Sequence, residues 1–176
     1  NQINYLPILN KKKELVGIHK LDIFEKKINE PNPIVIMAGG FGKRLMPITK
    51  TLPKSMVRIG EKPLLETIIL KAKEEGFRKI YISVYYKAKV IEKYFGNGQK
   101  FGVNIEYIRE KKPLGTIGSL SLIKNKFSSD FIVINCDILT EINLKNIIQY
   151  HKKTKSALTV TYKKYELQNP YGVLKI

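Results

Sequence analysis

The segment Gly39–Gly42 is the part of the sequence that points most directly to chemistry. It holds three glycines, directly follows the apolar run Ile34–Ala38, and is continued by two cations, Lys43 and Arg44. Glycines permit a tight turn whose backbone N–H groups can face an anion. The spacing is neither the dinucleotide fingerprint GxGxxG nor the P-loop GxxxxGKS/T. The two cations favour a phosphate site, and a purely structural turn is the alternative.

Two charged side chains farther along have the chemistry to complete such a site. Lys54 follows a proline, and Asp137 lies just past the apolar run Phe131–Asn135. An ammonium group neutralises phosphate charge, and a carboxylate is a hard oxygen ligand of the kind Mg²⁺ prefers. The alternatives are a surface lysine and a cap for a helix over residues 139–146. His151 stands alone, which favours a surface position over a ligand role.

An alternation of strands and helices is the scaffold that would position these residues. Such alternation is typical of an α/β fold, here a Rossmann-like, mostly parallel sheet with flanking helices. Ligands of such sheets bind at the carboxyl ends of the strands, where the glycine segment and Asp137 lie. The predicted strands are Ile34–Ala38, Lys79–Tyr85, Asn104–Ile108, Phe131–Asn135 and Ala157–Tyr162, and the predicted helices are Pro63–Glu75, Lys87–Tyr94, Gly115–Lys124 and Asn143–Lys153.

The first 30 residues form a separate unit. A turn-rich joint, Asn29–Pro33, divides them from the α/β part. Before it, the apolar runs Tyr5–Leu9 and Leu15–His19 predict a hairpin, and a short helix is expected over Lys20–Ile28. A hairpin and one helix are too small to bury a core alone. We therefore expect residues 1–30 to be the end of a domain, and residues 31–176 to be a second one.

Composition excludes several functional classes. The net charge is +17, but only four of the 32 basic residues are arginine, and the lysines are scattered. Specific nucleic-acid recognition favours the arginine fork, so we expect a solvated basic surface that attracts small polyanions rather than nucleic acid. No apolar stretch is long enough to span a bilayer. The single cysteine fits a reducing, cytoplasmic environment.

The α/β part resembles the sugar-1-phosphate nucleotidyltransferases. The resemblance begins with the run Gly-Gly-Phe-Gly-Lys-Arg-Leu-x-Pro-x-Thr over residues 39–49, then Pro53-Lys54 and Lys62-Pro63-Leu64. It continues through residues 94–98, 101–103, 110–118, 135–137 and 170–173, and so covers residues 33–176. The implied reaction joins a nucleoside triphosphate to a sugar 1-phosphate and releases pyrophosphate. Its nucleophile is already an anion, which explains why no general base stands out.

The resemblance also implies a role for particular residues. Arg44, Lys54 and Asp137 would be catalytic: Arg44 on the leaving pyrophosphate, Lys54 on the sugar phosphate and α-phosphoryl group, and Asp137 on Mg²⁺. The sugar phosphate would also meet Tyr171 and Gly172. The nucleotide would be bound by residues of two loops: Ala38, Gly39, Gly40, Gly42, Lys43 and Arg44 in the first, and Glu110, Pro113 and Gly115 in the second.

In that family the loop 110–115 reads the nucleobase. A carboxylate at Glu110 can accept from guanine N1–H and N2–H₂, whereas uracil and thymine offer a single imide N–H. This favours GTP, with UTP, dTTP or CTP as alternatives. A loop that merely caps the next helix is the structural alternative. A non-catalytic nucleotide sensor and a nucleic-acid module are rival functions of other classes.

Three departures from the family pattern qualify the resemblance. Lys43 stands where threonine is commoner, Cys136 stands where glycine is commoner, and the family core runs on past Ile176. We therefore expect a truncated catalytic domain. Residues 5–23 resemble the closing hairpin and helix of a CBS motif, a regulatory module that binds adenine nucleotides. A CBS motif joined to a nucleotidyltransferase is typical of a bacterial subfamily linked to surface-glycan precursors. Association of the protein into a homo-oligomer is possible.

Overall fold

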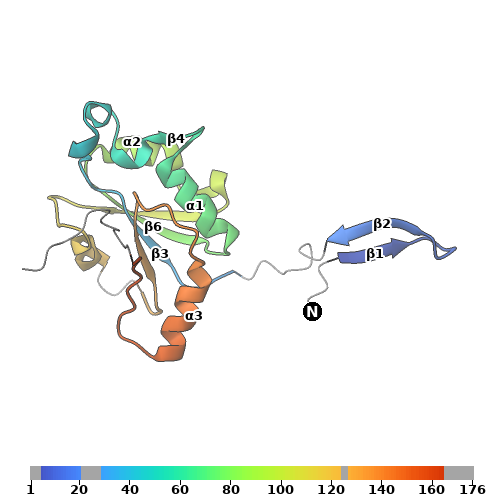
Figure 1. The fold of residues 1–176 in the computed structure, drawn as a ribbon. Coiled ribbons are helices and arrows are strands. Elements are labelled where there is room, and N and C mark those ends of the chain that lie inside the picture. Colours follow the sequence, from blue (N-terminus) through green and yellow to red (C-terminus); the bar gives the residue numbers. More distant parts are fainter. Residues whose placement is uncertain (1–4, 21–28, 124–126, 165–176) are drawn as a thin grey trace, which may run out of the picture.

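A four-stranded parallel sheet forms the centre of the computed structural model, which describes residues 5–20, 29–123 and 127–164 (Figure 1). The strands lie in the order β7-β6-β3-β8, with every neighbouring pair parallel. Their central residues are almost all apolar, as expected of strands covered on both faces. The α/β fold with a parallel sheet is thus confirmed. The strands are β3 (Ile34–Met37), β6 (Lys79–Val84), β7 (Asn104–Arg109) and β8 (Ile132–Asn135).

Three α-helices pack against one face of this sheet. Their apolar side chains share a core with alternate strand residues such as Ile36 and Ile82, while Val35 and Tyr81 point to the opposite face. That face is covered by a 3₁₀-helix, η6 (Gly118–Ile123), together with Phe127. Both faces are therefore buried, and the core lies between the sheet and its helices. The helices are α1 (Leu64–Glu74), α2 (Ala88–Phe95) and α3 (Leu144–Thr154).

Short elements fill the connection between β3 and α1. A small antiparallel pair, β4 (Arg58–Ile59) and β5 (Lys62–Pro63), precedes α1. Proline at the N-cap of α1 has no N–H to leave unpaired, which suits the start of a helix. Short 3₁₀-helices occupy Lys43–Leu45, Ile48–Lys50, Lys54–Met56 and, between α2 and β7, Gln99–Phe101.

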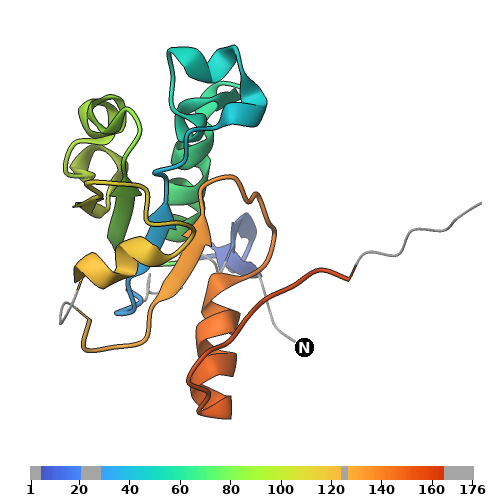
Figure 2. The same ribbon diagram turned by 90° about the vertical axis from the view of Figure 1, so that its left-hand side faces the viewer.

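Two predicted elements differ from the structure. The helix expected over Gly115–Lys124 is the 3₁₀-helix η6, which begins at Gly118. It cannot include Gly115, because no right-handed helix accommodates the φ of 81° at that residue. The strand expected over Ala157–Tyr162 is not formed. Figure 2 shows this segment running away from the sheet, and Val160 and Tyr162 are 71% and 89% exposed. Within the described residues it pairs with no strand, and β-structure requires such a partner.

The N-terminal hairpin is formed as predicted. β1 (Tyr5–Leu9) and β2 (Leu15–Lys20) pair antiparallel around a turn at residues 10–14. Its large apolar side chains are exposed, from 41% at Ile8 to 65% at Ile18. The helix expected over Lys20–Ile28 falls mainly on residues 21–28, outside the described part. The division into residues 1–30 and 31–176, and the likeness to a CBS motif, stay predictions.

Among the described residues, no helix combines the length and apolar character needed to cross a membrane.

Candidate active site

A cavity of about 370 Å³ opens at the carboxyl ends of the parallel strands. The sheet order places β3 in the middle, with β6 and β7 added on one side and β8 on the other. Strand order therefore reverses at β3, which is where open α/β sheets bind their ligands. The cavity is lined by the last residues of β3 and β8, by residues that follow β3, β7 and β8, and by Lys54: Met37, Gly39, Gly40, Phe41, Lys54, Glu110, Pro113, Leu114, Gly115, Thr116, Asn135, Cys136 and Asp137.

The glycine loop is held in a fixed shape by Thr49. The Thr49 hydroxyl, fully buried, donates to the Gly42 carbonyl at 2.9 Å. Gly42 has a φ of 66°, and a Cβ there would lie 2.8 Å from Thr49 Cγ2 and 2.9 Å from Lys54 Cβ. Only glycine fits such a contact. The Tyr86 hydroxyl donates to the Thr49 carbonyl at 3.2 Å, so the loop after β6 secures the same turn.

Lys54 and Asp137 form an ion pair at the cavity wall. The Lys54 ammonium donates to Asp137 Oδ2, and the two side chains are 31% and 42% exposed. This hydrogen bond, with the nearby charges of Lys54 and Arg44, lowers the pKa of the Asp137 carboxyl below its ordinary value. Asp137 is not a helix cap, because α3 begins later and Asn143 caps it. Lys54 is half-buried rather than a free surface lysine.

The Glu110 carboxylate is held on both oxygens. The Ser83 hydroxyl donates to Oε1 at 2.6 Å, and the Leu114 backbone N–H donates to Oε2 at 3.0 Å. Gly39 lies directly against this carboxylate, since a Cβ there would be 3.0 Å from Glu110 Oε1. Glu110 thereby links the glycine loop to the loop 110–115.

The structure brings together seven of the predicted site residues as cavity lining: Gly39, Gly40, Lys54, Glu110, Pro113, Gly115 and Asp137. The other four described residues do not line it. Ala38 is buried in the core, Gly42 shapes the turn, and Lys43 and Arg44 are exposed just outside. Tyr171 and Gly172 lie outside the described residues.

Two residues at this site were not predicted to belong to it from the sequence: Ser83, which supports a lining residue, and Cys136. Ser83 is fully buried under the cavity and contacts Glu110. The sequence held a signal for it, a single hydroxyl at the end of the apolar strand Lys79–Val84. Cys136 also lines the cavity. Burial, which outweighs the other effects, raises the pKa of its thiol to about 11, and this disfavours the reactive thiolate form.

The chemistry of Asp137 fits one ligand of a magnesium ion. It is an ionised carboxylate that borders the cavity. Within the described residues, no group of three or more His, Cys, Asp or Glu side chains lies together in a way that could hold a metal ion. Phosphate oxygens of a bound nucleotide are also hard ligands of the kind that Mg²⁺ prefers.

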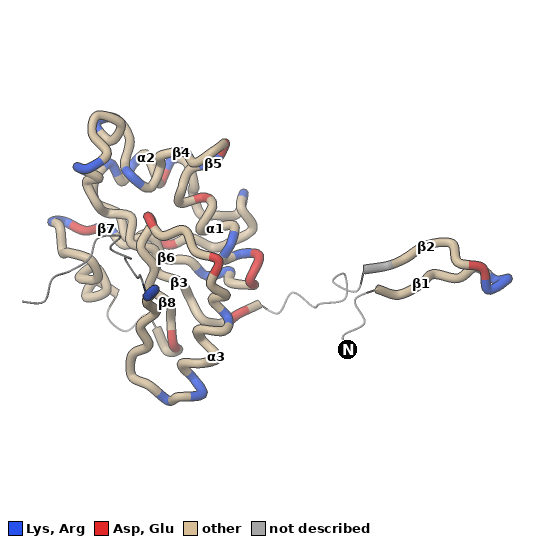
Figure 3. The backbone as a smooth tube through the Cα atoms, in the orientation of Figure 1, with Lys and Arg blue, Asp and Glu red and all other residues tan. Residues whose placement is uncertain are grey.

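Basic residues are spread over separate elements. Figure 3 shows lysines and arginines at the hairpin turn, around α2 and at the end of α3, with acidic residues between them. The four arginines of the described residues belong to separate segments, Arg44 to a 3₁₀-helix, Arg58 to β4, Arg78 to the segment before β6 and Arg109 to β7, whereas base recognition favours an arginine-rich stripe.

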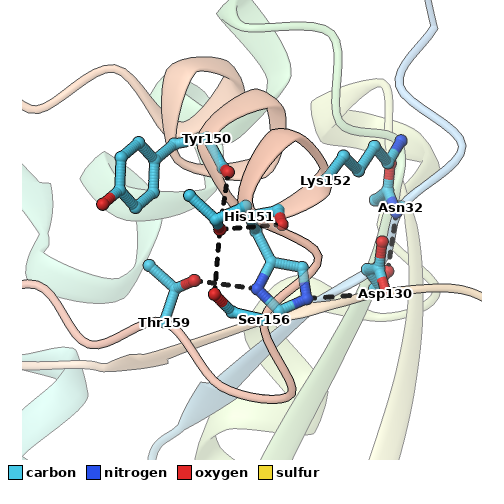
Figure 4. Close-up of polar contacts among 8 residues, drawn as sticks. Asn32, Asp130, Tyr150, His151, Lys152, Ser156 and Thr159 are labelled. Carbon is cyan, nitrogen blue, oxygen red and sulfur yellow. Dashed lines mark hydrogen bonds and ion pairs between the residues drawn. The ribbon is translucent and has the colours of Figure 1, made fainter.

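A second polar cluster lies at the amino ends of the strands, away from the cavity (Figure 4). His151 is only 19% exposed: its Nδ1 is 2.8 Å from Thr159 Oγ1, and its Nε2 is 3.7 Å from Asp130 Oδ1. The Lys152 ammonium donates to Asn32 Oδ1 at 3.1 Å. His151 is thus half-buried rather than on the open surface, and the cluster fastens α3 to the segments that precede β3 and β8.

Comparison with protein families identifies the α/β part. The family model described as "Nucleotidyl transferase" matches residues 34–176. The mannose-1-phosphate guanyltransferase of Yarrowia lipolytica is 35% identical over 144 residues, which cover 80% of this chain and 40% of that enzyme. The UTP--glucose-1-phosphate uridylyltransferase of a Synechocystis strain is 36% identical over 154 residues, with the same coverage. The chain thus spans about 40% of the length of these relatives.

Solved structures share the fold. HddC from Yersinia pseudotuberculosis, complexed with GMP-PN, is 32% identical with a TM-score of 0.61, over 68% of this chain and 54% of that one. UDP-glucose pyrophosphorylase complexed with UDP-glucose is 26% identical with a TM-score of 0.59, over 70% of this chain and 54% of that one.

Proposed function

The chain belongs to the nucleotidyl transferase family, and on that premise we propose that it forms the nucleotide-binding part of a GTP:sugar-1-phosphate guanylyltransferase. The reaction would join the nucleotide to a sugar 1-phosphate and release pyrophosphate. The observation that carries this proposal is the cavity at the carboxyl ends of the strands. There a glycine loop, the Glu110 carboxylate and the pair Lys54–Asp137 meet within one space of about 370 Å³.

The residues of this cavity suit phosphoryl transfer without a general base. An oxygen of the sugar phosphate attacks the α-phosphorus, the new P–O bond forms, and the bond to the pyrophosphate oxygen breaks. Since the nucleophile is already an anion, the protein must position the groups and neutralise charge. Lys54 borders the cavity and is suited to the α-phosphoryl and sugar phosphate groups. Arg44, exposed beside the glycine loop, is suited to the leaving pyrophosphate.

Mg²⁺ is the metal that this chemistry calls for. When bound, it would neutralise charge that develops on the transferred and leaving groups. Asp137 would hold it on the protein side. The Lys54 ammonium donates to the same carboxylate, and we expect it to turn toward the phosphates when the substrates are bound.

Glu110 supports GTP as the nucleotide. Its carboxylate can accept from both N1–H and N2–H₂ of guanine, and a pyrimidine offers only one such donor. The similarity to a mannose-1-phosphate guanyltransferase agrees with this choice. UTP, which the similar uridylyltransferase is named for, is the main alternative. The alternative to an enzyme is a non-catalytic sensor, which binds a nucleotide without transferring it.

Three finer proposals concern the protein that contains this chain. We propose that it acts in the cytoplasm, which the single cysteine supports, and that it supplies precursors for bacterial surface glycans. Its N-terminal hairpin would close a CBS module that binds an adenine nucleotide. The exposed apolar side chains of that hairpin support a partner surface, either such a module or a second copy.

A thermal-shift panel tests the proposed nucleotide. The chain is heated with GTP, UTP, CTP, dTTP or ATP, each with and without Mg²⁺. A ligand that binds only the folded state raises the melting temperature, so we expect a rise with GTP that Mg²⁺ enlarges. If UTP or dTTP raises the melting temperature instead, the proposed nucleotide is wrong, but the proposed type of reaction still stands.

If none of the five nucleotides raises the melting temperature, the proposal is contradicted. A labelled oligonucleotide at physiological salt serves as the control for the +17 charge. Tight binding of that oligonucleotide together with no response to nucleotides would favour the nucleic-acid rival, because non-specific binding weakens steeply with salt.

A further inference from the structure

Ser83 lies beneath Glu110, the proposed base-reading residue, and its hydroxyl donates to the Glu110 carboxylate. It is fully buried on β6 and sits in parallel register with Met37 of β3 and Ile108 of β7. Its side chain is on the face opposite α1, with those of Tyr81 and Val35. Ser83 is the last residue but one of β6, and Glu110 directly follows β7 at the same edge of the sheet.

The hydrogen bonds around Glu110 leave a defined part of its carboxylate free. A carboxylate has about four lone-pair positions, two on each oxygen. Ser83 Oγ occupies one position on Oε1, and the Leu114 N–H occupies one position on Oε2. Among the described residues these are the hydrogen bonds to the two carboxylate oxygens, which leaves one position on each oxygen for a ligand in the cavity that Glu110 lines.

Guanine matches the two remaining acceptor positions of the Glu110 carboxylate. Its N1–H and N2–H₂ are adjacent donors, which can meet the two oxygens of one carboxylate side by side. A carboxylate plane that is fixed beforehand forms this pair of bonds at a lower entropic cost than one that rotates freely. The Leu114 N–H belongs to a loop, whereas Ser83 belongs to the central sheet, so Ser83 is the rigid support of the two.

We infer that Ser83 is a positioning residue for nucleobase selection: its hydroxyl orients the Glu110 carboxylate to accept from both guanine donors. This inference rests on the proposed GTP site and adds the residue that sets its discrimination. Gly39 contributes to the same geometry, because any side chain there would push against Glu110 Oε1 and Tyr85.

The test compares GTP with ITP, which differs from GTP only by lacking the 2-amino group, and with UTP. Isothermal titration calorimetry is performed on the wild-type chain, Ser83→Ala and Ser83→Thr. In Ser83→Ala we expect the preference for GTP over ITP to fall about tenfold, the size of one well-placed hydrogen bond to a charged group. Ser83→Thr keeps the hydroxyl and should keep the preference.

Ser119→Ala is the matched control. Ser119 is equally buried, but its hydroxyl contacts the sulfur of Met37 at 3.6 Å instead of a carboxylate. It should leave the ratio of GTP to ITP affinity unchanged. Glu110→Gln replaces one acceptor by a donor and should abolish the preference without any change at Ser83.

The outcomes separate this inference from the proposed function. If the wild-type chain binds none of the three nucleotides, the proposed function fails, and the inference fails with it. If it binds GTP but does not distinguish ITP, or if Ser83→Ala keeps the full preference, the inference is overturned while the GTP site stands. A fall in Ser83→Ala alone, with Ser83→Thr and Ser119→Ala unchanged, supports it.

Discussion

The Lys54 ammonium and the Asp137 carboxylate, 83 residues apart in the sequence, are joined by a hydrogen-bonded ion pair at the cavity wall. Without ligands, each group satisfies the other's charge. In the proposed reaction, phosphate groups would compete for the lysine, and a divalent cation would compete for the aspartate. The pair therefore holds the two charges that the proposed phosphoryl transfer requires, and both could be redirected to substrates at little cost because the contact is partly exposed.

The first prediction concerns Lys54. Lys54→Ala should lower turnover of the enzyme that contains this chain by about a hundredfold or more, because a cation aimed at developing phosphoryl charge is lost. Its melting temperature should change little, since a partly exposed ion pair contributes only about 0–1 kcal/mol. Pyrophosphate release and thermal unfolding measure the two effects. Lys50→Ala, at an exposed lysine, is the control, and undiminished turnover in Lys54→Ala would remove the proposed role.

The second prediction concerns the metal. Asp137→Asn keeps the size of the side chain but removes the charge that attracts Mg²⁺. We expect GTP to bind this variant about equally with and without Mg²⁺, whereas Mg²⁺ should strengthen binding to the wild-type chain. Calorimetric titration with and without a chelator measures this difference. A full Mg²⁺ effect in Asp137→Asn would show that the metal has other ligands.

The third prediction concerns pH. The hydrogen bond from Lys54 holds the pKa of the Asp137 carboxyl below its ordinary value of about 3.8 in the folded state. Asp137 therefore contributes stability above pH 4, and this contribution is lost as pH falls through the lower, folded-state pKa. The difference in free energy of unfolding between the wild-type chain and Asp137→Asn should be constant from pH 7 to 5 and shrink below pH 4. Urea titrations across that range measure it, and a difference that grows on acidification would contradict the ion pair.

The fourth prediction concerns the glycine loop. Gly42→Ala places a Cβ at positive φ within 3 Å of Thr49 and Lys54, which should lower the free energy of unfolding by about 1–3 kcal/mol. Gly40→Ala is the matched control, because a Cβ there meets nothing within 4 Å. It should cost less than about 1 kcal/mol. Denaturant unfolding compares the two, and equal effects would refute the fixed turn.

The fifth prediction concerns Cys136, the single cysteine of the chain. Burial raises the pKa of its thiol to about 11, so little thiolate exists at pH 8. Iodoacetamide should react roughly a hundredfold more slowly with the native chain than with the urea-unfolded chain, in which the thiol has its ordinary pKa of about 8.5. Mass spectrometry over time follows the modification. Rapid reaction of the native chain would mean that the end of β8 opens readily.

The sequence alone determined most of the fold and the identity of the site-forming loops. Apolar runs predicted the four strands of the sheet within two residues of their observed ends, and amphipathic spacing predicted α1, α2 and α3. Such patterns can be recognised locally, because the spacing of apolar residues along the chain indicates which face of a strand or helix is suited to burial. The loops after β3, β7 and β8 were recognised for the same reason, since their glycines and charges stand together in the sequence.

The sequence failed where long-range partners decide. The segment Ala157–Tyr162 has the alternation of a strand, but a strand needs another strand beside it, and it has none within the described residues. Similarly, His151 is isolated in the sequence and becomes half-buried only because Thr159 and Asp130 fold against it.

Only the tertiary structure decided which residues of the site act on one another. Nothing local joins Lys54 to Asp137 or Ser83 to Glu110; these contacts exist because parallel strands bring the ends of β3, β6, β7 and β8 to one edge of the sheet. Residue types and spacing specify what chemistry each segment can perform. The register and order of the strands fix the distances, and distances determine which charges pair and which lone pairs stay open to a ligand.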